Sequence, residues 1–258
     1  MSRFKCFNFA IAGVVLAGAA TLVVGDARER YMQWDVHAKD RPQPPVVDPG
    51  HAGTQEKTGK PPSDAIVLFD GTETDELNTN WTINDAGELV ISRGGCVTDK
   101  SFGDIQLHVE WMVPENQAKA SGQRRGNSGI FIMGKYEIQI LDNKDNQTYP
   151  DGMAGSIYGQ FPPLVNAGRG IGQWQSYDII FRRPHFNEDG SVKKPARVTI
   201  LHNGVLVQDN QELMGPTAHK RRTSYKAHPD KLPIKFQNHG QIVHYRNMWV
   251  RELEPRDD

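Results

Sequence analysis

Two pairs of polar residues, each spaced two apart on a predicted strand, are the candidates for chemistry. Glu137 and Gln139 alternate with tyrosine and isoleucine, and alternate residues of a strand lie on one face, about 6.6 Å apart. His108 and Glu110 alternate in the same way with apolar residues. Carboxylates and imidazoles at this spacing can transfer protons or bind a divalent metal ion. The alternative is that both pairs belong to solvated sheet faces.

The strands that would position these pairs recur along the chain from about Ala65 to Glu254. Alternating apolar and polar residues predict strands over residues 66–69, 81–83, 88–92, 105–113, 126–133, 136–142, 177–181, 197–202, 205–208, 234–237 and 242–251. The dipeptides Asn203-Gly204 and Gly134-Lys135 predict two-residue hairpin turns. The predicted fold is therefore all-β, a jelly-roll sandwich of two antiparallel sheets.

Two long polar segments separate the predicted strands. Residues 143–172 are rich in Gly, Pro and Asn and contain Tyr158. A loop of this length in a compact domain is more often functional than idle. The second segment, residues 214–232, carries Lys220, Arg221 and Arg222. Those three residues form either a solvated loop or a contact to a substrate.

The N-terminal quarter differs from the rest. Residues 1–25 combine early basic residues with a long apolar run, which is typical of a secretory signal peptide. Residues 26–64 are rich in proline and predict a linker. We therefore expect a periplasmic or secreted protein of one domain, residues 65–254, with no stable membrane insertion after signal cleavage. Its net charge of −1 gives no reason to expect a nucleic-acid partner.

The central motif Tyr136-Glu137-Ile138-Gln139-Ile140-Leu141-Asp142-Asn143 resembles the domain family named for 3-keto-disaccharide hydrolysis. The other segments that carry this resemblance are residues 68–71, 127–131, 157–163, 172–177, 236–240 and 245–247. The resemblance implies a concanavalin A-like sandwich in an exported bacterial protein. It also implies an enzyme that acts on oligosaccharides or glycosides whose C3 hydroxyl has been oxidised to a ketone.

Ordinary glycoside hydrolysis fits the central motif poorly. Glycosidases of the same fold carry Glu-x-Asp-x-x-Glu, and Glu137, Gln139 and Asp142 occupy those positions here. A retaining glycosidase needs two carboxyl groups about 5–5.5 Å apart, whereas Asp142 points away from Glu137 in a regular strand. A 3-keto sugar allows an easier reaction, in which a base removes the acidified C2 proton and the group at C1 is eliminated.

The predicted site combines these residues. We assign catalysis to His239 and Glu137, because an ordinary imidazole titrates near neutral pH and a carboxylate is the rival base. Substrate binding is assigned to Gln139, Tyr158 and Arg246. Glu110, Glu137 and His108 are the predicted ligands of a divalent metal ion of unknown identity. Glu110, Glu137, Gln139 and His239 are expected to converge on one pocket. The alternative function is a non-catalytic carbohydrate-binding module.

Overall fold

The computed structural model describes residues 46, 48 and 50–254. The predicted signal peptide, residues 1–25, and most of the predicted linker lie outside this range. The strands are β1 (Ile66–Phe69), β2 (Leu77–Ile83), β3 (Leu89–Phe102), β4 (Ile105–Met112), β5 (Ser128–Ile132), β6 (Tyr136–Ile140), β7 (Gln175–Arg182), β8 (His185–Phe186), β9 (Val192–Lys194), β10 (Arg197–His202), β11 (Val205–Glu212), β12 (Leu232–Phe236) and β13 (His244–Glu252). Three short 3₁₀ helices are η1 (Glu115–Gln117), η2 (Gly122–Arg124) and η3 (Pro150–Gly152). None of the helices in this part of the chain could span a membrane.

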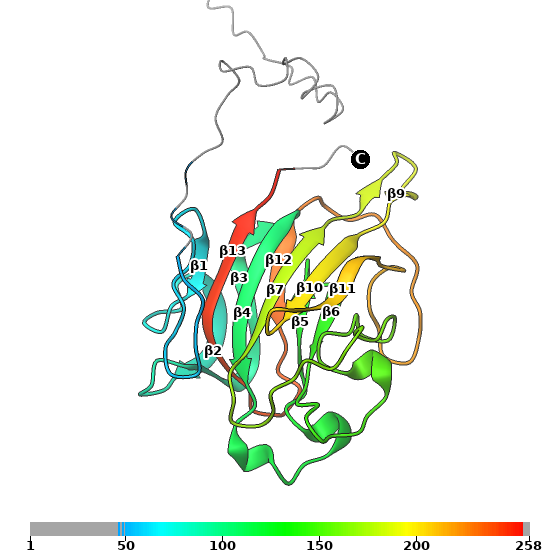
Figure 1. The fold of residues 1–258 in the computed structure, drawn as a ribbon. Helices are drawn as coiled ribbons and strands as arrows, with labels where there is room; N and C mark the ends of the chain where they lie inside the picture. The colour runs from blue at the N-terminus through cyan, green and yellow to red at the C-terminus, as the bar shows by residue number, and fades with distance from the viewer. Residues whose placement is uncertain (1–45, 47, 49, 255–258) are drawn as a thin grey trace, which may run out of the picture. The chain divides into compact units, whose positions relative to one another are not determined.

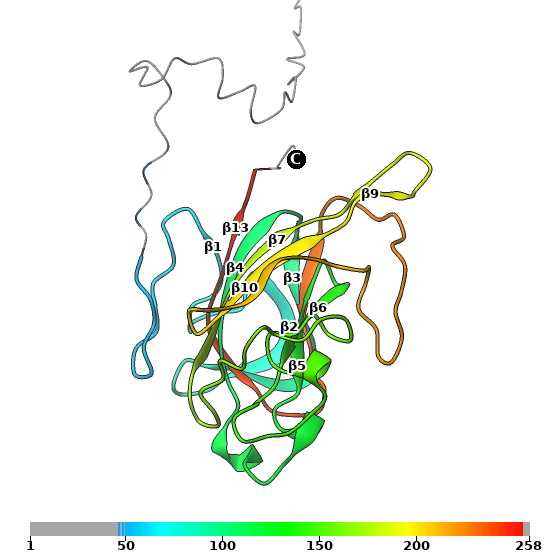
Figure 2. The same ribbon diagram turned by 45° about the vertical axis from the view of Figure 1, so that its right-hand side comes forward.

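Most strands belong to one antiparallel sheet. Their order is β11-β10-β7-β4-β13-β3-β12-β5-β6, with β1 paired to β13 and β2 paired to β3, while β8 and β9 form a separate ribbon. The sheet curls so that β11, β10, β7, β4 and β13 form one layer and β3, β12, β5 and β6 form the other (Figures 1 and 2). This confirms the prediction of an all-β jelly-roll. The difference is that the two layers are continuous, because β13 pairs with both β4 and β3.

The core lies between the two layers. On β4, Leu107 and Val109 are fully buried, and on β6 Ile138 belongs to the same apolar cluster. The hydroxyl of Tyr177 on β7 donates to the carbonyl of Gln139 on β6 at 2.7 Å, which joins the layers. Side chains that alternate with these core residues must point away from the core on opposite sides of the sandwich. We call these two surfaces the β4 outer face and the β6 outer face.

Of the two predicted hairpin turns, one is confirmed and one is wrong. Asn203 and Gly204 have φ values of 54° and 79°, and they alone connect β10 to β11, as expected for Asn-Gly. The turn between β5 and β6 contains three residues, since Ile132 pairs with Tyr136. Met133 there has a φ of 55°, a conformation that is rare for a residue with a side chain. The predicted turn was therefore one residue too short.

Residues 50–62 form a strap that packs on the β4 outer face. His51 and Lys60 pair with each other across a β-bridge, so the strap folds back on itself without adding a strand to the sheet. The side chain of Gln55 accepts from the backbone N–H of Trp174 at 2.8 Å and donates to its carbonyl at 2.9 Å. This part of the predicted linker is therefore docked on the sheet.

Candidate active site

Four side chains form one row on the β6 outer face. Phe131 lies opposite Glu137, and Lys235 lies opposite Phe131, in antiparallel register. Beyond β6, Ile157 bridges Ile138, and the N–H of Tyr158 donates to the carbonyl of Glu137 at 3.1 Å. Directly opposed residues project to the same face of a sheet. The row Tyr158–Glu137–Phe131–Lys235 therefore places an aromatic ring, a carboxyl group, a second ring and an ammonium group on one surface.

Glu137 is the most unusual member of the row. Its side chain is buried, with 6% of the residue exposed, yet its carboxyl group forms no hydrogen bond or ion pair with any described residue. Burial raises the pKa of Glu137 to about 8, although the nearby charge of Lys235 acts in the opposite direction. A carboxyl group with such a pKa can accept or donate a proton near neutral pH.

Gly129 makes room for this carboxyl group. It lies opposite Gln139 in the register of β5 and β6. A Cβ atom at this position would overlap the Oε1 atom of Glu137. The strand has an ordinary extended φ here, so the requirement for glycine comes from the close approach of the carboxyl group.

A second row of polar groups runs beside the first. The N–H of Gln139 donates to the carbonyl of Ser156, and the N–H of Gln237 donates to the carbonyl of Gly129. The Oε1 atoms of Gln139 and Gln237 and the hydroxyl of Ser156 are buried without a partner among the described residues. Buried polar atoms are rarely left unpaired in native proteins. This row therefore has hydrogen-bonding capacity that a polyhydroxylated ligand can use.

The amide of Gln139 is held in a fixed orientation. Its Nε2 atom donates to the Oδ1 atom of Asn127 at 3.2 Å and to the Oε1 atom of Gln123 at 3.3 Å. Asn127 in turn donates to Gln123 at 3.1 Å. These bonds occupy the donor side of Gln139 and leave its carbonyl oxygen unpaired.

The structure brings some of the predicted site residues together and separates others. Glu137, Gln139 and Tyr158 share the β6 outer face. His239 follows β12 in the same layer, four residues after Lys235, which is up to about 13 Å of extended chain. Its ring is exposed and lies 3.2 Å from the Oε1 atom of Gln241. Asp142 is paired with Arg125 at 2.7 Å, so it offers no free second carboxylate.

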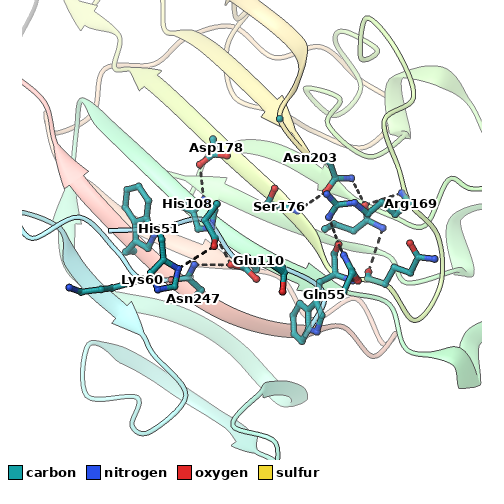
Figure 3. Close-up of a pocket in the computed structure, with 18 of the residues that line it drawn as sticks. His51, Gln55, Lys60, His108, Glu110, Arg169, Ser176, Asp178, Asn203 and Asn247 are labelled. Atoms are coloured by element: carbon teal, nitrogen blue, oxygen red, sulfur yellow. Dashed lines mark hydrogen bonds and ion pairs between the residues drawn. The ribbon is translucent and has the colours of Figure 1, made fainter. Parts of the chain in front are cut away.

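Glu110 and His108 lie on the opposite side of the sandwich, the β4 outer face (Figure 3), and Arg246 reaches the same face, where it pairs with Glu110. His108 Nδ1 is 2.6 Å from the carboxylate of Asp178, and His108 Nε2 is 3.6 Å from that of Glu110. Burial acts to lower the pKa of His108, but these two carboxylates outweigh it and raise the pKa to about 9. The ring also stacks on Trp249, with centroids 5.1 Å apart. His108 is therefore held as a cation.

Glu110 is saturated with partners. Arg246 Nε donates to one carboxylate oxygen at 2.6 Å and Asn247 Nδ2 to the other at 2.8 Å. A register shift in β13 between Arg246 and Trp249 and a φ of 46° at Asn247 mark a β-bulge. Such an extra residue lets two consecutive side chains reach one face. Burial raises the pKa of Glu110, but His108, Asn247 and Arg246 together lower it below its ordinary value.

This network anchors the strap. A guanidinium N–H of Arg246 donates to the carbonyl of Thr54, and the guanidinium carbon lies 4.1 Å from the centroid of the Trp174 ring. A Cβ on Gly53 would overlap the carboxylate of Glu110. A cleft of about 840 Å³ lies between the strap and the sheet. The donors of Arg246 therefore hold Glu110 and the strap, and its predicted role in substrate binding stays a prediction.

The predicted metal ligands do not form one site. Glu110 and His108 project from β4, and Glu137 projects from β6 in the opposite direction. The alternation was identified correctly on each strand, but only the pairing of the layers shows that the two polar faces are on opposite sides. Within residues 46, 48 and 50–254, no group of three or more His, Cys, Asp or Glu side chains is arranged to bind a metal ion. We assign no step to a metal.

Lys235 and Phe131 were not identified from the sequence as site residues. Lys235 lies between Ile234 and Phe236, both fully buried, so alternation alone marks it as outward-facing. Its Nζ atom lies 5.6 Å from the centroid of the Phe131 ring. What the sequence lacks is the register that places β12 beside β5, and therefore Lys235 in the row of Glu137.

The family that this chain matches defines a carbohydrate-active class of protein. Residues 64–251 match the 3-keto-alpha-glucoside-1,2-lyase-like domain, and the chain belongs to this family. A solved structure of a provisionally named glycosyl hydrolase from Parabacteroides distasonis is similar, with 38% identity, a TM-score of 0.79, and coverage of 86% of this chain and 96% of that one. A second structure from the same organism, provisionally named likewise, shares only the fold, with 17% identity, a TM-score of 0.52, and coverage of 74% and 94%. No curated protein matches this chain.

Proposed function

We propose that this protein cleaves 3-keto-glycosides, with Glu137 as the base that removes the C2 proton. The observation that supports this most strongly is the unpaired, buried carboxyl group of Glu137, whose pKa burial raises to about 8. A raised pKa makes a carboxylate a stronger base. The match to the 3-keto-alpha-glucoside-1,2-lyase-like domain over residues 64–251 supports the choice of substrate.

The reaction balances without a redox partner. Glu137 takes the proton from C2, and the electron pair delocalises onto the C3 carbonyl oxygen as an enolate. The enolate then expels the oxygen at C1, which leaves with the proton that Glu137 took from C2, and a double bond forms between C1 and C2. Addition of water to this enone, with its hydroxyl at C1 and a proton at C2, gives the free 3-keto sugar and completes a net hydrolysis.

The other residues of the two rows have roles that follow from their chemistry. Lys235 is two strands from Glu137, about 10 Å by strand spacing, and its ammonium group can stabilise the enolate oxygen. The carbonyl oxygen of Gln139 is buried without a partner among the described residues and can accept a hydrogen bond from a sugar hydroxyl that displaces its cover. Tyr158 ends the row with an aromatic ring. His239 keeps its predicted role in proton transfer as a hypothesis: it lies in the same layer, beyond Lys235, and forms no hydrogen bond with Glu137.

The decisive experiment separates this enzyme from a carbohydrate-binding module. Purified protein is incubated with a 3-keto-disaccharide and with its unoxidised parent, each with and without a chelator, and released sugars are measured. We expect release from the keto-disaccharide alone. Binding of both sugars without release would favour the binding module. Comparing sugar release with and without the chelator tests whether cleavage needs the divalent metal ion predicted from the sequence.

Export of the protein is also proposed, from the sequence alone. Residues 1–25 have the layout of a signal peptide, and they lie outside the described residues. Fractionation of expressing cells and N-terminal sequencing of the mature protein test this. A full-length cytoplasmic chain would contradict it.

A further inference from the structure

A second concave site lies at the Tyr158 end of the row. It is a pocket of about 460 Å³ on the protein surface. Its lining residues come from the two long segments between strands, and they are Tyr149, Asp151, Tyr158, Gly159, His219, Lys220, Arg221 and Arg222. Tyr158 belongs to both the row and the pocket, so a ligand seated at Glu137 can extend directly into this pocket.

Hydrogen bonds fix the loop that carries the basic residues. Thr217 accepts from the backbone N–H of Glu137 at 3.0 Å, three residues before Lys220. The hydroxyl of Thr223 donates to the carbonyl of Pro216, which closes the loop on itself. Gly159 allows a close approach, because a Cβ there would lie 3.3 Å from the carbonyl oxygen of Ala218. The basic side chains are therefore held beside Tyr158 by the backbone of the candidate active site.

Aromatic groups form one wall of the pocket. The Tyr158 hydroxyl lies 3.0 Å from that of Tyr149 and 2.9 Å from Nδ1 of His219. The rings of Tyr158 and His219 are stacked, with centroids 6.4 Å apart and 14° between their planes. Hydrogen-bonded rings of this kind provide a fixed wall against which a sugar ring can pack.

The lining of the pocket also carries an excess of positive charge. Lys220, Arg221 and Arg222 are all exposed, and the only carboxylate among the lining residues is that of Asp151. Within the described part of the chain, none of the three cations forms an ion pair with a carboxylate. Lys220 has a φ of 55°, and a lysine in this conformation is strained by about 1 kcal/mol or more. Guanidinium groups bind planar oxyanions through paired N–H donors.

We propose that this pocket is a subsite for an anionic substituent on the sugar or aglycone that leaves C1. The substituent is a monoanionic oxyanion, either a uronate carboxylate or a sulfate ester. This inference rests on the proposed function, since Lys235 at the C3 oxygen and Glu137 at C2 direct C1 and its leaving group toward Tyr158 and the pocket. It narrows the substrate class to 3-keto-glycosides with an acidic leaving group.

The test measures equilibrium binding of unoxidised disaccharides, which does not depend on turnover. The ligands are a glucosyl-glucuronate, its uncharged glucuronamide, and a glucosyl-glucose sulfated on the second ring. We expect the uronate or the sulfate ester to bind about tenfold more tightly than the amide, as for a charge-assisted hydrogen bond. That preference should shrink as salt is raised.

The variant Arg221→Gln/Arg222→Gln should reduce the ratio of the two affinities to about one. The matched control Lys226→Gln removes an exposed charge from the same loop outside the pocket and should keep the ratio. Equal affinities for charged and uncharged ligands in the unchanged protein overturn the proposal, as does a preference that survives in the double variant. Absence of keto-disaccharide cleavage would instead reject the proposed function. The ratio of affinities for charged and uncharged disaccharides is measured independently of cleavage, so the two failures can be distinguished.

Discussion

Gly129 and Glu137 are matched across neighbouring strands, because the carboxyl group of Glu137 occupies the space that a Cβ on Gly129 would fill. The glycine lies opposite Gln139, so its missing side chain opens the sheet surface between the two rows of polar groups. The position of the candidate base is therefore set by a neighbour that contributes no functional group.

Gly129→Ala should displace the carboxyl group of Glu137. Overpacking of this kind costs about 1–3 kcal/mol of stability, and a misplaced base can cost about 100-fold in rate. The measurement is kcat/KM on a 3-keto-disaccharide, together with urea unfolding. The control is Gly95→Ala, where the added Cβ would lie 3.9 Å from Cε of Lys235 and 3.9 Å from the carbonyl oxygen of Phe236, both ordinary van der Waals distances that leave Lys235 in place. Equal activity in both variants would show that the space beside Glu137 is not needed.

Glu137→Gln should change how stability depends on pH. The pKa of Glu137 rises from its ordinary 4.5 to about 8 on folding, so the folded protein binds the proton more tightly than the unfolded chain. Stability that is fully present below about pH 4.5 is therefore lost as pH rises to about pH 8. The loss of stability is on the order of 5 kcal/mol. Urea unfolding at several pH values should show this loss in the unchanged protein and a flatter profile in the variant; identical profiles would contradict it.

The same ionisation should appear in the kinetics. If Glu137 is the base, kcat/KM for a 3-keto-glycoside should rise with pH and level off above about pH 8, because the free enzyme must lose this proton first. The measurement is kcat/KM between pH 5 and pH 9.5 for two 3-keto-glycosides with similar leaving groups. A rate that falls across this range would assign the protonated form, and so the acid role, to Glu137.

Glu110→Ala should destabilise the protein and free the strap. It leaves Arg246 and His108 buried without their shared carboxylate, and breaking such a buried pair costs about 3–5 kcal/mol. Thermal unfolding and tryptic cleavage after Lys57 measure the two effects. Glu76→Gln, which removes an exposed ion pair with Lys100, should change stability by less than about 1 kcal/mol. Unchanged protease resistance in the Glu110 variant would show that the strap is held by other contacts.

The sequence predicts the fold well where one face of each strand is buried. Residues 105–113 alternate strictly, and β4 (Ile105–Met112) places its apolar residues in the core as expected. Prediction fails where glycine interrupts the pattern. Residues 88–92 were expected to be a short strand, yet β3 runs from Leu89 to Phe102. Gly94, with a φ of 72°, absorbs a register shift there without ending the strand.

Only part of the candidate site can be predicted from the sequence. Alternation places Glu137 and Gln139 on one face, and it does the same for His108 and Glu110. It cannot say whether the two faces meet, because that depends on how distant strands pair. Lys235 was missed for the same reason, and the strap was missed because its contacts to Trp174 and Arg246 join segments far apart in the chain.

The central claim is that Glu137 removes the C2 proton of a 3-keto-glycoside. The most direct measurement compares cleavage of a 3-keto-disaccharide with cleavage of the same sugar carrying deuterium at C2, in the unchanged protein and in Glu137→Gln. We predict slower cleavage of the deuterated sugar by the unchanged protein and loss of cleavage in the variant. Equal rates for the two sugars with full activity in Glu137→Gln would contradict the claim.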